Sequence, residues 1–147
     1  MAKVVRLIRY REKGDPGTEV PEAALIKDAG MEGNRVQGGE RQLCLLTRDA
    51  RSWMRSQTEP GLCFARFKEN ILTDGIALNE LKTGCRLSVG EAILGISEES
   101  KHCHDACVFY IRREDCRLSQ CVRFAVVLES GVARPGDPIR VLGAVVS

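Results

Sequence analysis

The sequence has no long hydrophobic run. No apolar stretch approaches the ~20 residues that a helix needs to cross a bilayer. At the N-terminus, a basic residue recurs at about every third position (Lys3, Arg6, Arg9), which leaves no apolar core for a secretory signal. We therefore expect a cytoplasmic protein without a membrane partner.

The chain also lacks a charge excess of one sign. Its 22 basic and 20 acidic side chains leave a formal charge of +2, whereas proteins that bind nucleic acid usually carry a strong basic excess. We expect no nucleic-acid partner. Hydrophobic residues make up 44% and charged residues 29% of the 147 residues, which excludes a disordered chain. The length suits a single domain over residues 1–147.

Cysteine, by contrast, is abundant: the chain has seven, an odd number. A reducing cytoplasm disfavours a structural disulfide framework, so metal binding, sulfur chemistry or simple burial must account for them. Three lie in apolar or strand-like surroundings, where a free thiol behaves as a small hydrophobe. We expect these three to be buried: Cys44, Cys63 and Cys85.

The remaining cysteines gather within nineteen residues, as Cys103, Cys107, Cys116 and Cys121. Both histidines of the chain, His102 and His104, flank Cys103, and Lys101 precedes it by two positions. Cationic neighbours stabilise a thiolate and lower the pKa of the thiol. The pattern predicts that Cys103 is a reactive thiolate.

The same residues allow a metal site. Four thiols and two imidazoles are enough ligands for tetrahedral zinc. Cys-x3-Cys, however, is not the usual spacing of a zinc knuckle, and no second tight pair follows along the chain. Structural zinc or iron, and cysteines without a special role, remain alternatives to a reactive Cys103.

The dominant periodicity is that of β-strands. Residues 85–89 alternate between apolar and polar. After Gly90, residues 91–98 predict a second strand, with Ala92, Leu94 and Ile96 on one side. Other segments rich in Val, Leu and Ile predict strands at 3–10, 22–27, 41–47, 123–129 and 138–142. Between the second and third of these five strands lies a glycine-rich connection, which we expect to be flexible and functional.

Two short helices fit between the strands. The first begins at Thr47 or Asp49, either of which is a good N-cap, and buries Ala50, Trp53 and Met54. The second follows Asp105. Many short strands with few helices predict a mostly β fold, a closed or nearly closed barrel.

Four segments in order carry a family resemblance. They are the stretch 27–48 with its Glu-Arg-Gln-Leu-Cys-Leu-Leu-Thr, then Phe-Lys-Glu-Asn-Ile-Leu-Thr-Asp-Gly-Ile at 67–76, then 81–92, and finally 124–137. Together they resemble the MOSC family, the molybdenum cofactor sulfurase C-terminal domain, in a short stand-alone form. Asn34 and Glu40 depart from the family pattern, which usually has Asp and His at these places.

The resemblance implies a barrel like the β-barrel domain of pyruvate kinase. It also implies molybdenum cofactor (molybdopterin) binding or sulfur transfer through a cysteine. Some relatives are terminal domains of pyridoxal phosphate-linked cofactor sulfurases, and others reduce N-hydroxylated compounds. Cys103 holds the position of the family cysteine and would be the molybdenum ligand, and Cys103-His104-Asp105-Ala106-Cys107 with Cys116 resembles a subgroup pattern.

The candidate site follows from this resemblance and from the residues. Catalytic candidates are Cys103, Cys107, Cys116 and His104, with Cys107 or Cys116 as a resolving thiol. Cofactor-binding candidates are Arg41, Glu69, Asn70, Thr73 and Lys101, among which Arg41 suits a bidentate phosphate contact. A turn-stabilising role for Glu69 and Asn70, and an exposed strand position for Arg41, remain open.

The length leaves no room for a pyridoxal phosphate domain, so we expect a cysteine desulfurase, or a protein that makes or accepts molybdenum cofactor, as a separate partner. A small molybdopterin-dependent reductase and a non-catalytic metal-binding module are the alternatives. If the protein is an enzyme, it could be a sulfur transferase or an oxidoreductase, and both remain open. A dimer is expected only because dimers are the commonest oligomers.

Overall fold

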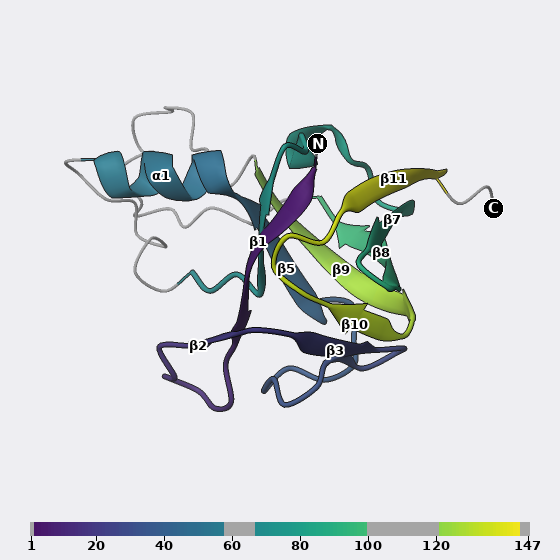
Figure 1. Cartoon of the computed structure of the whole chain (residues 1–147), viewed down its shortest axis with the longest axis horizontal. Helices are drawn as coiled ribbons and strands as arrows, with labels where there is room; N and C mark the ends of the chain where they lie inside the picture. Colours follow the sequence, from purple (N-terminus) through teal and green to yellow (C-terminus); the bar gives the residue numbers. More distant parts are fainter. Residues whose placement is uncertain (1, 58–66, 100–120, 145–147) are drawn as a thin grey trace.

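The computed structural model describes residues 2–57, 67–99 and 121–144 (Figure 1). In this part of the chain strands dominate, with one α-helix and one short 3-10 helix. The strands are β1 (Lys3–Arg9), β2 (Thr18–Val20), β3 (Ala23–Ile26), β4 (Gly30–Met31), β5 (Leu43–Thr47), β6 (Ile71–Asp74), β7 (Cys85–Val89), β8 (Ala92–Glu98), β9 (Val122–Glu129), β10 (Gly131–Ala133) and β11 (Ile139–Ala144). The helices are α1 (Arg48–Ser56) and η1 (Leu78–Glu80).

The hairpin of β7 and β8 follows directly from the sequence pattern. Leu87 and Val89 are buried while Arg86 is exposed, as alternation requires. The strands pair in antiparallel register from Val89 opposite Ala92. Gly90 begins the two-residue turn between them with φ +57°, a backbone conformation that glycine adopts without strain.

Eight strands form one sheet in the order β11-β7-β8-β9-β5-β6-β1-β2, and only β5 and β6 in it are parallel. The edge strands β11 and β2 do not pair, so the sheet is rolled but not closed. Its two ends approach where Lys3 bridges Pro138 and where the Ile139 amide donates to Ala2 O at 3.0 Å. The prediction of a mostly β fold is confirmed. The sheet is more open than the predicted barrel, because β11 contacts only the first residues of β1.

Two apolar clusters lie on opposite faces of β5. Leu43 and Leu45 point into the main core within the rolled sheet, together with residues of the surrounding strands. Leu46 points to the other face, where it packs with Leu72 of β6 and with α1. Burial of Cys44 and Cys85 is confirmed, since each is 7% exposed, and Cys63 lies outside the described residues.

Helix α1 begins as the sequence predicts. Thr47 is the N-cap, and its hydroxyl accepts from the Ala50 amide at 3.2 Å. Ala50 and Met54 are buried against Leu46 and Leu72, and Trp53 packs partly buried beside them. The second expected helix, after Asp105, lies outside the described residues.

A small second sheet, in the order β10-β3-β4, lies against one end of the large one, with β3 and β10 side by side (Figure 1). The glycine-rich connection between β3 and β5 contains β4, and one of its side chains is hydrogen-bonded to the residue that follows β1. Its Asn34 is 6% exposed and accepts from the Tyr10 amide at 3.0 Å. The connection is thus attached to β1 by a buried side chain.

Neither described helix has the length and apolar composition that crossing a membrane requires.

Candidate functional site

The candidate site lies where β8 ends and β9 begins. These neighbouring antiparallel strands place Glu98 opposite Phe124. The residues between them include Lys101, Cys103, His104, Cys107 and Cys116, which all lie outside the described residues. We call residues 100–120 the cysteine segment. The structure describes the residues directly before and after it.

Arg41 lies at the start of the cysteine segment. Its Nε donates to Glu98 Oε1 at 2.9 Å and its Nη2 to Glu98 Oε2 at 2.7 Å, and its guanidinium stacks on the Phe124 ring, 4.5 Å from the centroid. The side chain is 54% exposed. Because the Glu98 carboxylate occupies one edge of the guanidinium, a phosphate at Arg41 would bind through the remaining N–H groups or displace Glu98.

The Arg41–Glu98 pair makes the stability depend on pH. The hydrogen bond from Arg41 holds the pKa of Glu98 below the ordinary 4.5. A lowered carboxyl pKa stabilises the fold above about pH 4.5, and this contribution is lost as the pH falls through the lowered value. We expect Glu98→Gln to cost less than about 1 kcal/mol at neutral pH, because the pair is partly exposed.

Urea unfolding between roughly pH 3 and 7 measures this prediction. Glu98→Gln is expected to lose less stability on acidification than the wild type does. Glu80→Gln, at an exposed residue of η1, is the matched control. Identical acid dependence in Glu98→Gln and the wild type would count against the ion pair.

Asn70, expected to bind cofactor, lies buried between β1 and β5. Its Oδ1 accepts from the Cys44 amide at 3.0 Å, and its Nδ2 donates to Ile8 O at 3.2 Å and to Asn34 Oδ1 at 3.3 Å. Its main-chain N–H donates to Cys44 O and its carbonyl accepts from the Ile8 amide, each at 2.8 Å. Asn70 therefore joins three segments, and both polar atoms of its side-chain amide are hydrogen-bonded within the fold.

Thr73 and Glu69 are buried as well. Thr73 is 0% exposed, and its hydroxyl donates to Leu46 O at 3.3 Å. The Glu69 carboxylate forms an ion pair with Arg51 of α1, and both side chains are mostly buried. A direct ligand contact by Glu69, Asn70 or Thr73 stays a prediction, and in this conformation each side chain contacts protein atoms instead.

Arg51 and Tyr10 surround Glu69, and sequence reasoning did not single out either of them as a site residue. The Tyr10 hydroxyl donates to Glu69 O at 2.8 Å, and burial, followed by the nearby Glu69 charge, raises the pKa of Tyr10. Arg51 lies 5.7 Å from the Phe67 ring centroid. Among the described residues its buried Nε has no hydrogen-bond acceptor, so this guanidinium has an unused donor.

A cleft of about 420 Å³ opens beside the carboxyl ends of β5 and β6. It is lined by the start of α1, from Thr47 to Ala50, by the chain from Asp74 to Ala77, and by Asn79 and Cys121. The partly buried Cys121 follows the cysteine segment directly and packs on the apolar cluster beneath α1. The cleft thus lies beside the end of the cysteine segment.

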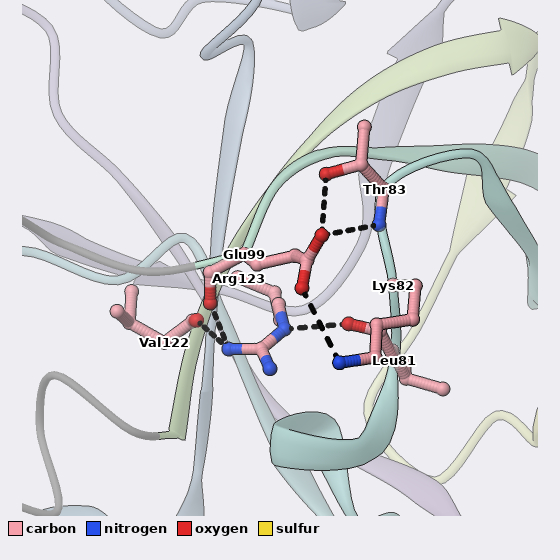
Figure 2. Close-up of polar contacts among 6 residues, drawn as sticks. All are labelled: Leu81, Lys82, Thr83, Glu99, Val122 and Arg123. Atoms are coloured by element: carbon pink, nitrogen blue, oxygen red, sulfur yellow. Dashed lines mark hydrogen bonds and ion pairs between the residues drawn. The ribbon is translucent and has the colours of Figure 1, made fainter.

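Arg123 is a third residue that sequence reasoning missed, after Arg51 and Tyr10. It lies on β9 in phase with Ala125 and Val127, which are both fully buried. A charge at an inward position of a predicted strand was the signal that could have identified it. Figure 2 shows its guanidinium among carbonyl groups from both ends of the cysteine segment.

Metal ligands are not grouped in the described ranges 2–57, 67–99 and 121–144, where no three His, Cys, Asp or Glu side chains gather. The candidate ligands in the cysteine segment lie outside these ranges. Thiolates are soft ligands suited to molybdenum or zinc. The exposed part of Arg41 suits an anionic group such as the cofactor phosphate.

Comparison with solved structures shows the fold. The chain is similar to YiiM from Geobacillus stearothermophilus (TM-score 0.68, 20% identity, covering 97% of this chain and 75% of that one). It is also similar to YiiM from Escherichia coli (TM-score 0.65, 21% identity, covering 100% of this chain and 72% of that one). A third similar structure is the YUAD protein from Bacillus subtilis (TM-score 0.67, 15% identity, covering 95% of this chain and 94% of that one).

Sequence comparison gives the family. No curated protein matches the chain significantly. The sequence profile of the MOSC domain matches residues 32–140, well over half of the chain. This match includes the strands β5 to β10 and the cysteine segment between β8 and β9. The chain therefore belongs to the MOSC domain family, which is associated in general with molybdenum cofactor binding.

Proposed function

We propose that this MOSC domain acts in molybdenum cofactor metabolism in the cytoplasm, binding the cofactor or carrying its sulfur on Cys103. The observation that carries the proposal is the position of residues 100–120 between β8 and β9 of a MOSC fold, with Arg41 and Arg123 bound at their ends.

As a sulfur carrier, the Cys103 thiolate attacks the terminal sulfur of a donor persulfide. A new S–S bond forms on Cys103, and the donor leaves as a thiolate. Attack by the Cys107 or Cys116 thiolate on the Cys103 sulfur then forms a disulfide and releases hydrosulfide. The donor would be a separate cysteine desulfurase.

As a cofactor-binding protein, the same domain would use Cys103 as the soft metal ligand, with Lys101, Arg41 and Arg51 available to the phosphate. The cofactor, when bound, supplies redox chemistry at its metal. The chain contributes orientation and charge: Glu69 holds Arg51, and Glu98 holds Arg41, so both guanidinium groups are ordered before a ligand arrives.

Intact-mass spectrometry of protein purified without reductant, with elemental analysis of the same sample, tests the proposal. We expect a mass increase of one sulfur atom, or stoichiometric molybdenum, in the wild type. Cys103→Ala should lose the signal completely. Cys85→Ala, at a buried thiol of β7, should keep it.

Other outcomes contradict the proposal. Zinc alone, retained in the wild type, would indicate a metal-binding module. Neither sulfur nor molybdenum, even after incubation with a desulfurase or with molybdenum cofactor, would exclude Cys103 as a carrier. A signal that persists in Cys103→Ala would assign the chemistry to another thiol.

A further inference from the structure

The two edge strands of the large sheet differ in what they leave exposed. Strand β2 is three residues long, and its exposed residues, Thr18 and Glu19, are polar. Strand β11 has six residues, and two of them are apolar and exposed, Val141 at 52% and Leu142 at 44%. Short, polar edge strands resist pairing with another chain, whereas longer apolar ones favour it. The β11 edge is therefore the one that can accept a further strand.

Val141 faces the interior of the rolled sheet although half of it is exposed. It lies opposite Leu87 of β7, and residues directly opposite each other in an antiparallel pair project to the same face of the sheet. Leu87 is buried in the main core, and so is Ile139, two residues before Val141 on the same face. An edge that is only protected from pairing often carries a charge at such an inward position. Here the position holds an apolar side chain that the sheet leaves uncovered.

The main chain of β11 also offers hydrogen-bonding groups at this edge. The Ile139 amide points away from β7 and donates to Ala2 O at 3.0 Å. Alternate amides of a strand point to the same edge, and the register with β7 shifts only after Val141, so the Val141 amide points the same way. Among the residues that the structure describes, none accepts from the Val141 amide across this edge.

Positive charges lie along this edge on the outer face of the sheet. Arg86 of β7 and Arg140 of β11 are exposed and alternate with inward-facing neighbours, so both project outwards. Lys3, also exposed, bridges Pro138 at the same edge. None of these three cations forms an ion pair with another residue in the described part of the chain. The edge thus combines uncovered apolar surface on its inner face with unpaired positive charge on its outer face.

We propose that β11 is the docking site for an extended acidic segment of a partner protein, which pairs with β11 as a further strand of the sheet. Alternate residues of an added strand point to opposite faces, so its apolar side chains would cover Val141 and its carboxylates would face Arg86 and Arg140. A second copy of this chain fits less well, because pairing two β11 strands brings the like charges of Arg140 together. This docking site is independent of the function proposed above and does not involve the cysteine segment.

Fluorescence anisotropy of a labelled peptide tests the docking site. The probe is a peptide of about eight residues in which glutamate and valine alternate, the length of an ordinary strand. We expect saturable binding that weakens as the salt concentration rises from about 0.05 to 0.3 M, because salt screens the attraction between carboxylates and guanidinium groups. A peptide in which lysine replaces glutamate should bind at least about tenfold more weakly. Hydrogen exchange of the Val141 amide, followed by NMR, should slow when the glutamate peptide is bound.

Two variants of β11, each with a matched control, locate the binding. Val141→Lys should weaken it about tenfold or more, because the added strand would then cover an unpaired ammonium group. Thr18→Lys adds the same charge at the other edge strand and should not weaken binding. Arg140→Glu should weaken binding about fivefold through charge repulsion. Its control is Arg35→Glu, at an exposed residue between β3 and β5, which should change the affinity less than about twofold.

Several results would overturn the docking site. One is the absence of saturable binding of the glutamate peptide to the wild type up to about 1 mM. Equal binding by wild type and Val141→Lys would show that the peptide binds elsewhere, and equal affinity for the lysine peptide would show that charge does not select the partner. A dimer that sedimentation velocity detects in the wild type, and that Val141→Lys abolishes, would assign the edge to a second copy of the chain instead.

Discussion

Replacing Asn70 with alanine is expected to lower the free energy of unfolding by about 3 kcal/mol, because several buried groups lose their partners at once. The Cys44 amide would lose its acceptor at 3.0 Å, and Ile8 O and Asn34 Oδ1 would lose a donor. Asn70 is 5% exposed, so water cannot readily replace these bonds. Urea unfolding measures the change, and thermal unfolding should show a fall of about 10 °C in Tm.

Two further variants separate the contributions at Asn70. Asn79→Ala, at an exposed amide of η1, should change stability by less than about 0.5 kcal/mol. Asn70→Asp keeps an acceptor for the Cys44 amide but turns a buried carboxylate oxygen towards the acceptors Ile8 O and Asn34 Oδ1, so it should destabilise at least as much as Asn70→Ala. Wild-type stability in Asn70→Ala, combined with loss of bound molybdenum or sulfur, would instead assign the amide to ligand binding.

The second large effect is expected for Gly131→Ala at the start of β10. A Cβ atom at Gly131 would lie 2.3 Å from Glu91 C, 2.4 Å from Glu91 O and 2.6 Å from Ala92 N. All three are main-chain atoms, and this turn is tied to β10 by the bond from the Glu91 amide to Val132 O at 3.1 Å. The main chain must therefore move, at a cost of about 3 kcal/mol.

Gly95→Ala, in β8 of the large sheet, is the matched control. Its Cβ would meet Leu128 Cδ1 at 3.1 Å, the end of a side chain that can change rotamer. We expect a change below about 1 kcal/mol, measured by urea unfolding of both variants side by side. Equal stability of Gly131→Ala and Gly95→Ala would show that β10 does not approach Glu91 so closely in solution.

The sequence alone determined the long strands, the first helix and the family. Residues 85–89 became β7 because alternation of apolar and polar residues allows only one face to be buried, and residues 91–98 contain β8, in which Ala92, Leu94 and Ile96 are buried. Thr47 capped α1 because its hydroxyl satisfies an amide that the helix leaves free. The four segments resembling MOSC domains lie in or beside the match over residues 32–140.

Only the tertiary structure revealed the short strands and the partners of the polar residues. The short strands β2, β4, β6 and β10 were not predicted, because such short strands carry little periodicity and depend on their neighbours in the sheet. The four-residue β3 was predicted, as part of the apolar-rich segment 22–27. Asn70 joins residues far apart along the chain, and Arg123 reaches back to Leu81. The alternation of apolar and polar residues can predict that a side chain is buried. Its hydrogen-bond partner depends on which distant segments pack next to it, and the sequence pattern does not contain that information.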